Sequence, residues 1–363
     1  MKSRIVSIDI FRGLTMIFMI IVNTPGSWKH VYPPLRHASW HGCTPTDLIF
    51  PAFLFIVGVA MFYSLRKYGN SLNQSSLFRI FRRVAAIFII GILLKMFPHF
   101  GRDLGSLRIM GVLQRIALAY GIAAILALSI KREQLWILIG ATLLFYWGVL
   151  FVFGGSNPYS IESNLVRTID IAILGKQHLY TGFGIAFDPE GLLSTLPAVI
   201  TIITGYYAGS ITGKGSKGGP AILKLILIGA ASIGLGLAWD LLLPINKPLW
   251  TSSYVLYTSG ISMVIYALLY LISDVLKFRG WEGPLNHFGV NALVAYILSV
   301  LWTKTLMIIP AGSTGSLYTW LYSGICVPLA GDLNGSLLFA IMQVVIIWVP
   351  VYLLFRKKIY IRL

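Results

Sequence analysis

Long apolar runs recur along the whole chain, and each is long enough to cross a lipid bilayer as one helix. A helix needs about 20 mostly apolar residues to span the hydrocarbon core, and it satisfies its own backbone hydrogen bonds there. Charged residues make up only 11% of the 363 residues, against roughly 25% in soluble proteins. We therefore predict an all-α polytopic membrane protein, with a single domain over residues 1–363. The ten expected spans are 5–24, 46–65, 79–97, 110–130, 135–153, 191–209, 221–241, 252–275, 285–309 and 334–355.

Basic residues are concentrated in alternate loops, and this pattern predicts how the chain is oriented. The net charge is +17, and lysine and arginine are enriched in the cytoplasmic loops of membrane proteins. If the N-terminus is cytoplasmic, ten spans place every basic cluster and the C-terminus on that side. No separate basic domain is left over, so nucleic-acid binding is not expected. The residues concerned are Lys2, Arg4, Arg66, Lys67, Arg79, Arg82, Arg83, Lys131, Arg132, Lys214, Lys217, Lys277, Arg279, Arg356, Lys357, Lys358 and Arg362.

The opposite face receives the loops that carry most of the polar motifs, and it is periplasmic if the protein belongs to a bacterial inner membrane. The apolar piece 316–330 is short, and Gly331 follows it directly. Counting it as an eleventh span would place the basic C-terminus outside, so we expect an interfacial or re-entrant helix. The loops on the outer face are 25–45, 98–109, 154–190 and 242–251.

The first outer loop contains an unusually dense group of polar side chains. His37, Trp40, His41 and Asp47 fall between two apolar segments, where polar groups are costly to keep and often functional. An imidazole acts as base, acid or nucleophile near neutral pH, and its neighbours can orient it. The two histidines, four apart, would suit a metal on a helix, but nearby prolines and a glycine oppose that helix. No metal is therefore expected.

Two groups in the first span have both a structural and a functional interpretation. Asn23 is either a helix terminator before Pro25 and Gly26 or a donor to a developing oxyanion. Asp9 and Arg12, three residues apart, form either an interfacial ion pair or a contact for an anionic substrate. The residues alone leave both alternatives open.

Later spans contain further polar residues that need a partner or a water-filled cavity. Gln114 and Arg115 lie inside the span 110–130, where the arginine either snorkels to the interface or marks a site. His287 and Asn291, four residues apart, either bond within the core or line a cavity.

The remaining outer loops contain two more polar groups. Asp188 and Glu190 are either ordinary capping residues of the next helix or carboxylates that recognise a cationic or hydroxyl-rich acceptor. His178 lies just upstream of them. The second group, which includes an aromatic residue suited to anchoring at the interface, consists of Asn246, Lys247 and Trp250.

In order, and over nearly the full length, these motifs resemble one family. It is the transmembrane acyltransferase family that includes lysosomal heparan-alpha-glucosaminide N-acetyltransferase and its bacterial relatives. Each motif is weak by itself, and their combination is specific. The matching stretches are Ser7-Ile8-Asp9-Ile10-Phe11-Arg12-Gly13, Val22-Asn23, His37-Ala38-Ser39-Trp40, Asp47-Leu48-Ile49-Phe50-Pro51, Gly111-Val112-Leu113-Gln114-Arg115, His178-Leu179-Tyr180, Asp188-Pro189-Glu190-Gly191 and Asn246-Lys247-Pro248-Leu249-Trp250.

The resemblance implies a ten-helix core, with acetyl-CoA entering from the cytoplasm as the donor. It implies the amine of a terminal glucosamine on the far side as the acceptor, and a homodimer embedded in membrane lipids. His37 corresponds to the family's catalytic histidine, and Asn23 to an asparagine near it. The chain departs from the family at His41, which replaces an asparagine, so no catalytic role is assigned to it.

These expectations give a hypothesis for the site. His37 removes the proton of the sugar ammonium or attacks as a nucleophile, and Asn23 stabilises the oxyanion. The residues expected to contact the acceptor are Trp40, Asp47, His178, Asp188, Glu190, Asn246, Lys247 and Trp250. Those expected to contact coenzyme A are Arg12, Arg82, Arg83, Gln114, Arg115, His287 and Asn291.

Two other functions are compatible with the same sequence features. A secondary transporter or a flippase for a lipid-linked sugar would also need many spans and buried charges. Such folds often contain internal repeats, and the sequence shows none. An acyltransferase acting on hydroxyl groups of envelope polysaccharide would share the donor and the topology, and would differ in its acceptor.

Overall fold

Helices form every named element in the computed structural model, which describes residues 5–66, 71–98, 100, 104–213, 218–312 and 315–361. The all-α prediction is therefore confirmed for this part of the chain. The longer helices are α1 (Val6–Asn23), α2 (Ile49–Leu65), α3 (Gln74–Met96), α4 (Val112–Ser129), α5 (Leu135–Phe153), α7 (Leu192–Gly213), α8 (Gly219–Asp240), α9 (Ser252–Tyr270), α11 (Ala292–Ile308) and α13 (Val327–Arg356). The shorter elements are α6 (Leu165–Leu174), α10 (Gly283–Val290), α12 (Leu317–Leu321), the 3-10 turns η1 (Pro33–Leu35), η2 (Pro45–Leu48), η4 (Leu104–Ser106), η5 (Arg132–Gln134) and η6 (Lys176–His178), and the π turns η7 (Leu271–Val275) and η9 (Tyr322–Cys326).

Eight helices of the described residues are long and apolar enough to cross a membrane, and nine if the bent pair α10–α11 counts as one span. The remaining expected span, 79–97, is α3, which has three arginines in its first half and a lysine near its end. It begins at Gln74, before the predicted start, because the Asn73 side chain accepts a hydrogen bond from the Ser76 backbone. Ten spans were expected, whereas eight or nine helices of the described residues are long and apolar enough, because α3 differs from the others in composition.

The span expected at 285–309 is broken in the structure. It is divided into α10 and α11, which bend by 88°. The break lies at Asn291, whose φ of −118° and ψ of 37° do not continue a helix. The sequence offers no proline here, so the bend was not expected.

The last expected span is longer than predicted and is also interrupted. α13 begins at Val327 and contains Gly331, whose φ of 75° lies outside the helical region. The helical residues 317–330 that precede this break correspond to the expected interfacial or re-entrant helix. Their position relative to a membrane stays a prediction.

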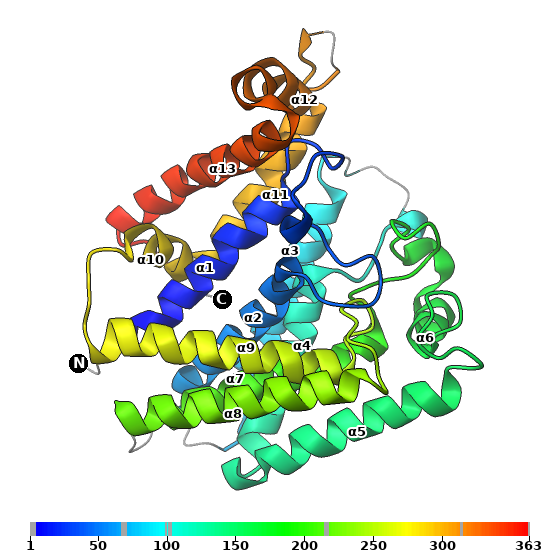
Figure 1. The fold of residues 1–363 in the computed structure, drawn as a ribbon, viewed down its shortest axis with the longest axis vertical. Helices are drawn as coiled ribbons and strands as arrows, with labels where there is room; N and C mark the ends of the chain where they lie inside the picture. The colour runs from blue at the N-terminus through cyan, green and yellow to red at the C-terminus, as the bar shows by residue number, and fades with distance from the viewer. Residues whose placement is uncertain are drawn as a thin grey trace.

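The four loops expected on the outer face meet at one end of the bundle, where α1 ends and α2 begins (Figure 1). We call this the His37 end. Hydrogen bonds join the loops, from Gly42 N–H to the Ile245 carbonyl (2.7 Å), from the Trp40 indole to the Tyr159 carbonyl (2.8 Å) and from Ile109 N–H to the His178 carbonyl (3.2 Å). The side of the membrane that this end faces stays a prediction. Of the basic residues behind that prediction, the following lie outside the described part of the chain: Lys2, Arg4, Lys67, Lys214, Lys217 and Arg362.

The outer loop 154–190 contains a helix that the sequence analysis missed. α6 starts after Asn164, whose side chain accepts a hydrogen bond from the Arg167 N–H at 2.8 Å. With 10 residues it is too short to cross a bilayer. Its buried residues are Val166 and Asp170, and Figure 1 shows it at the edge of the molecule.

Glycines allow the backbones of α2 and α7, and those of α1 and α10, to come into contact where these helices cross. At the crossing of α2 and α7, a Cβ atom on Gly58 would lie 1.9 Å from the Ile202 carbonyl oxygen. At the crossing of α1 and α10, a Cβ atom on Gly289 would lie 1.8 Å from the Asp9 carbonyl oxygen. Small residues at such crossings are typical of closely packed membrane helices. The opposing glycines are Gly205 and Gly13.

Candidate active site

His37 is held by a buried carboxylate that precedes α2. The Asp47 carboxylate accepts hydrogen bonds from the Thr44 backbone (3.1 Å), the Thr44 hydroxyl (3.0 Å) and the Ala38 backbone (3.0 Å), which fix its position. Its Oδ1 lies 2.6 Å from His37 Nδ1. Because a carboxylate can only accept, Nδ1 carries the proton and Nε2 is left as a base. The Asp47 side chain is 1% exposed and the His37 side chain 47%, so the imidazole is accessible from outside.

A lysine completes this arrangement from the loop between α8 and α9. Lys247 Nζ lies 3.3 Å from Asp47 Oδ1 and 3.1 Å from His37 Nδ1. Burial lowers the pKa of Lys247, while the Asp47 carboxylate acts in the opposite direction. The Lys247 ammonium compensates the charge of the buried Asp47 carboxylate. Lys247 was expected to contact the acceptor, and in the structure its partner is Asp47.

The neighbouring aromatic and amide residues fasten the loops around this pair. The Asn246 side chain donates to the Trp40 carbonyl at 2.9 Å and accepts from the Leu249 N–H at 2.7 Å. The Trp250 indole is buried and donates to the Thr201 hydroxyl at 3.1 Å. These residues were expected to bind the acceptor, and the structure gives each of them a partner within the protein.

An arginine that the sequence analysis did not single out binds the two carboxylates at the end of the 154–190 loop, Asp188 and Glu190. Arg108 donates from Nε and Nη2 to the fully buried Asp188 at 2.8 and 2.7 Å, and from Nη2 to Glu190 at 2.6 Å. Its guanidinium also lies 4.7 Å from the centre of the Tyr180 ring. His178 Nδ1 donates to the Leu107 carbonyl at 2.7 Å. Arg108 is 80 residues from Asp188, so no local pattern could reveal the pair.

We expect Arg108→Gln to lower the free energy of unfolding by about 2–3 kcal/mol, because it leaves the Asp188 carboxylate buried without its cation. Thermal unfolding of the purified protein in detergent measures this. Arg279→Gln is the matched control, since Arg279 is 45% exposed and 3.6 Å from Glu282, and such pairs contribute at most about 0.5 kcal/mol. Equal melting temperatures for the two variants would contradict the role of Arg108 as the cation that stabilises the buried Asp188 carboxylate.

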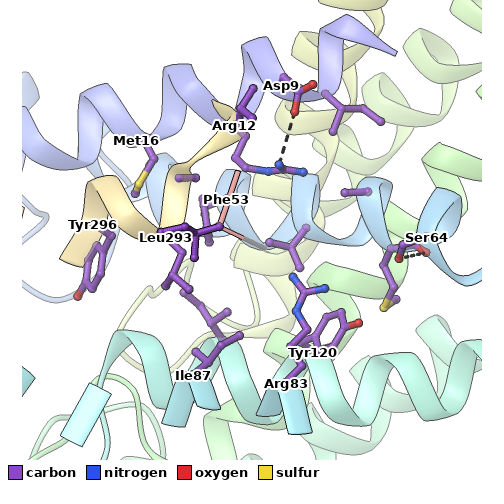
Figure 2. A pocket seen from close by; sticks show the side chains of 18 of the residues that line it. Asp9, Arg12, Met16, Phe53, Ser64, Arg83, Ile87, Tyr120, Leu293 and Tyr296 are labelled. Atoms are coloured by element: carbon purple, nitrogen blue, oxygen red, sulfur yellow. Dashed lines mark hydrogen bonds and ion pairs between the residues drawn. The ribbon is translucent and has the colours of Figure 1, made fainter. Parts of the chain in front are cut away.

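A cavity of about 900 Å³ lies among α1, α2, α3, α4 and α11, toward the end opposite His37 (Figure 2). We call it the donor cavity. Arg12, Arg66 and Arg83 line it. Arg12 Nη1 donates to the Gly289 carbonyl at 3.1 Å, and the Arg83 guanidinium lies 4.2 Å from the centre of the Tyr120 ring. Asp9 also lines the cavity, with its Oδ1 3.6 Å from Arg12 Nη1, and the three arginines still leave an excess of positive charge that suits a ligand with phosphate groups.

Two of the seven residues expected to contact coenzyme A, Arg12 and Arg83, line this cavity. Arg82 is exposed and is not among the residues that line the cavity. The other four bond to the protein as follows: Gln114 donates to the Phe88 carbonyl (3.2 Å), Arg115 donates to the Gly191 carbonyl (3.2 Å), His287 accepts from the Trp348 indole (3.1 Å), and Asn291 bonds to Ile359 and Ile361 (3.1 Å each). None of these four side chains lines the donor cavity, so the structure does not support their expected contacts with coenzyme A.

Asn23 is the last residue of α1, and its side chain is exposed. No contact between Asn23 and His37 is seen in the described part of the chain. Asp9, Arg12, Met16 and Met19 line the donor cavity, and their spacing of three or four residues continues to Asn23 on the same face of α1. Neither Asn23 nor His37 is among the residues that line the cavity.

The fold and the site define a polytopic membrane protein with a histidine–carboxylate pair at one end and an arginine-lined cavity toward the other. Comparison with known proteins identifies the family of the chain. The profile of the family "Heparan-alpha-glucosaminide N-acetyltransferase, catalytic" matches residues 4–223, and the chain belongs to this family. It is 30% identical to heparan-alpha-glucosaminide N-acetyltransferase of Homo sapiens over 361 residues, covering 82% of this chain and 53% of the human protein. It is 29% identical to the Mus musculus protein of the same name over 357 residues, covering 81% and 53%. The chain thus spans about half the length of these relatives.

Proposed function

We propose that the chain transfers an acetyl group from acetyl-CoA to the amine of a glucosamine-type sugar. The His37–Asp47 pair carries this proposal, because it presents an accessible base beside four loops that can hold a polar acceptor. The family of the chain supports the same reaction class. The proposed transfer needs no metal ion.

In the proposed reaction the sugar amine attacks the thioester carbonyl, and His37 Nε2 takes the amine proton. The carbon–sulfur bond breaks as the carbon–nitrogen bond forms, and the proton passes to the departing thiolate. The Asn23 amide donates to the oxyanion. The same imidazole could instead attack first and form an acetyl-imidazole. Labelled acetyl groups trapped on the protein without acceptor would support this second path.

We propose that the donor enters through the donor cavity and that the His37 end faces the periplasm of a bacterium. The three arginines of the cavity suit the phosphates of coenzyme A, and the distribution of lysine and arginine supports this orientation. Lipids would surround the exposed apolar faces of α5 and α8, and the family resemblance favours a homodimer. Since the cavity does not reach His37, helices must move apart before the thioester meets the imidazole.

Incubation of the purified protein with acetyl-CoA and a panel of amino sugars, read by mass spectrometry, tests the proposed function. We expect an acetylated amine product, and no product with sugars that carry only hydroxyl groups. The same reaction in proteoliposomes should proceed without net movement of the sugar, which separates the enzyme from a transporter. Absence of any acetylated amine would overturn the proposal.

We expect Arg83→Gln to raise the KM for acetyl-CoA at least tenfold, because it removes a cation that lines the donor cavity. Arg82→Gln is the matched control, since the neighbouring Arg82 is exposed and does not line the cavity. Steady-state kinetics with varied acetyl-CoA measure both. A similar KM for the two variants would remove Arg83 from the donor site.

A further inference from the structure

The segment that follows α13 turns back toward the bundle. α13 ends in a Schellman motif. The Ile359 N–H donates to the Leu354 carbonyl at 2.9 Å, and the Lys358 N–H also donates at 2.9 Å. The acceptor of this second bond is the Phe355 carbonyl. Lys358 occupies the position where glycine is usual, with a φ of 56°. This left-handed residue reverses the chain, so residues 357–361, which we call the strap, fold back beside the helices.

One side chain fastens the strap at the bend between α10 and α11. The Asn291 amide donates to the Ile359 carbonyl and accepts from the Ile361 N–H, at 3.1 Å each. It therefore binds the strap on both sides of Tyr360. If the strap leaves, water can replace both hydrogen bonds, and the net cost of exchanging protein partners for water is small. The attachment is specific and reversible.

The strap also forms part of the wall of the donor cavity. Ile361 lines the cavity together with Val290 and Ala292, the residues on either side of Asn291. Ile361 is half-exposed, whereas Met16 in the same wall is buried. The strap therefore lies at the rim of the cavity and not in its closed interior.

This rim lies away from the His37 end. Gly289 of α10 packs against the Asp9 carbonyl in the first turn of α1, whereas α1 ends at the His37 end (Figure 1). The bend at Asn291 follows two residues after Gly289. The strap thus covers the side of the cavity from which the donor enters in the proposed function.

Of the parts that enclose the cavity, the strap opens at the least cost. Ile359, Tyr360 and Ile361 are 43%, 37% and 48% exposed, so their release uncovers little additional apolar surface. The helices differ, because the glycine crossings hold α1 against α10 and α2 against α7, backbone on backbone. Segments with few buried contacts open locally while the rest of a protein stays folded.

We propose that the strap is the gate of the donor cavity and that Asn291 is its latch. Coenzyme A and its thioester enter and leave when the strap separates from Asn291, and the closed strap retains the donor during transfer. The inference rests on the proposed function and adds control of exchange at the same site. Because the latch joins protein to protein, it sets the rates of entry and exit and leaves the affinity nearly unchanged.

Binding of coenzyme A to the full chain in detergent tests the gate, with surface plasmon resonance giving the association and dissociation rates separately. We expect Asn291→Ala to raise both rates at least about fivefold, because it removes the two hydrogen bonds that favour the closed strap, and to change the Kd less than threefold. Asn286→Ala is the matched control, since Asn286 is an asparagine of α10 whose amide oxygen has no hydrogen-bond partner in the described part of the chain. It should bind as wild type does.

Ile361→Ala keeps the test valid if Asn291→Ala does not fold, because the half-exposed Ile361 contributes little packing. It shortens the side chain at the rim and should raise both rates at least about threefold. Ile359→Ala, two residues earlier and outside the cavity wall, should not. Wild-type rates in either of the variants at 291 and 361, or a higher Kd with an unchanged association rate, would overturn the gate and leave the proposed function intact. Absence of coenzyme A binding in the wild-type chain would overturn both.

Discussion

Acetyl transfer should be lost when His37 is replaced by alanine, with a fall in kcat of about 10²–10⁴. The reason is geometric, because Asp47 accepts a hydrogen bond from Nδ1–H and leaves Nε2 as the base for the amine. Binding of coenzyme A should change less than threefold, since His37 does not line the donor cavity. Turnover is measured by mass spectrometry of the acetylated sugar, and donor binding by isothermal titration calorimetry.

His41→Ala is the control for the His37 variant. His41 is exposed in the same loop, and it interacts with the Asn246 side chain at 3.3 Å, away from the carboxylate. We expect its turnover to remain within threefold of wild type. Because the His37 side chain is 47% exposed, added imidazole should restore part of the activity of His37→Ala. Near-normal turnover of that variant without imidazole would remove His37 from the mechanism.

The second large effect is expected for Asp47→Asn, with a fall in kcat on the order of 10²–10⁴. An amide nitrogen facing Nδ1 would donate to it, and the proton would then move to Nε2, where the base is needed. The donor KM should not change, because Asp47 is not part of the cavity wall. Steady-state kinetics with both substrates varied separate these two quantities.

Asp47 also has a structural role, so its variant needs a matched control. Thr44→Ala removes one hydroxyl that donates to the same carboxylate at 3.0 Å and leaves the histidine contact in place. It should lower the melting temperature by a similar amount and reduce kcat by less than tenfold. If both variants lost activity in proportion to their stability, the orienting role of Asp47 would be excluded.

The positions of the membrane helices could be predicted because they depend on local composition. Runs of apolar residues placed nearly all of the long helices, and the boundaries shifted by a few residues where capping decided them, as at Asn73. The bend at Asn291 could not be predicted. The Asn291 side chain donates to the Ile359 carbonyl and accepts from the Ile361 N–H, and both partners are far away in the sequence.

The site was predicted in part for the same reason. His37 stood out because a polar loop beside apolar spans is visible in the sequence itself. Asp47 was one of several neighbours expected to orient His37 and was also expected to contact the acceptor, and only the structure singles it out as the partner of the imidazole. Arg108 was missed because its partner Asp188 is 80 residues away, and pairing across such a distance leaves no local pattern.

The glycine crossings limit how the interior can rearrange. With backbone against backbone, neither α2 and α7 nor α1 and α10 can slide or rotate past each other without a clash. Each pair is a rigid block, and one block carries Asp47 at its tip while the other ends in Asn23. Any motion that separates α1 from α2 must therefore move these two pairs as units, and a bulky side chain introduced where α1 meets α2 would block that motion without touching either reactant.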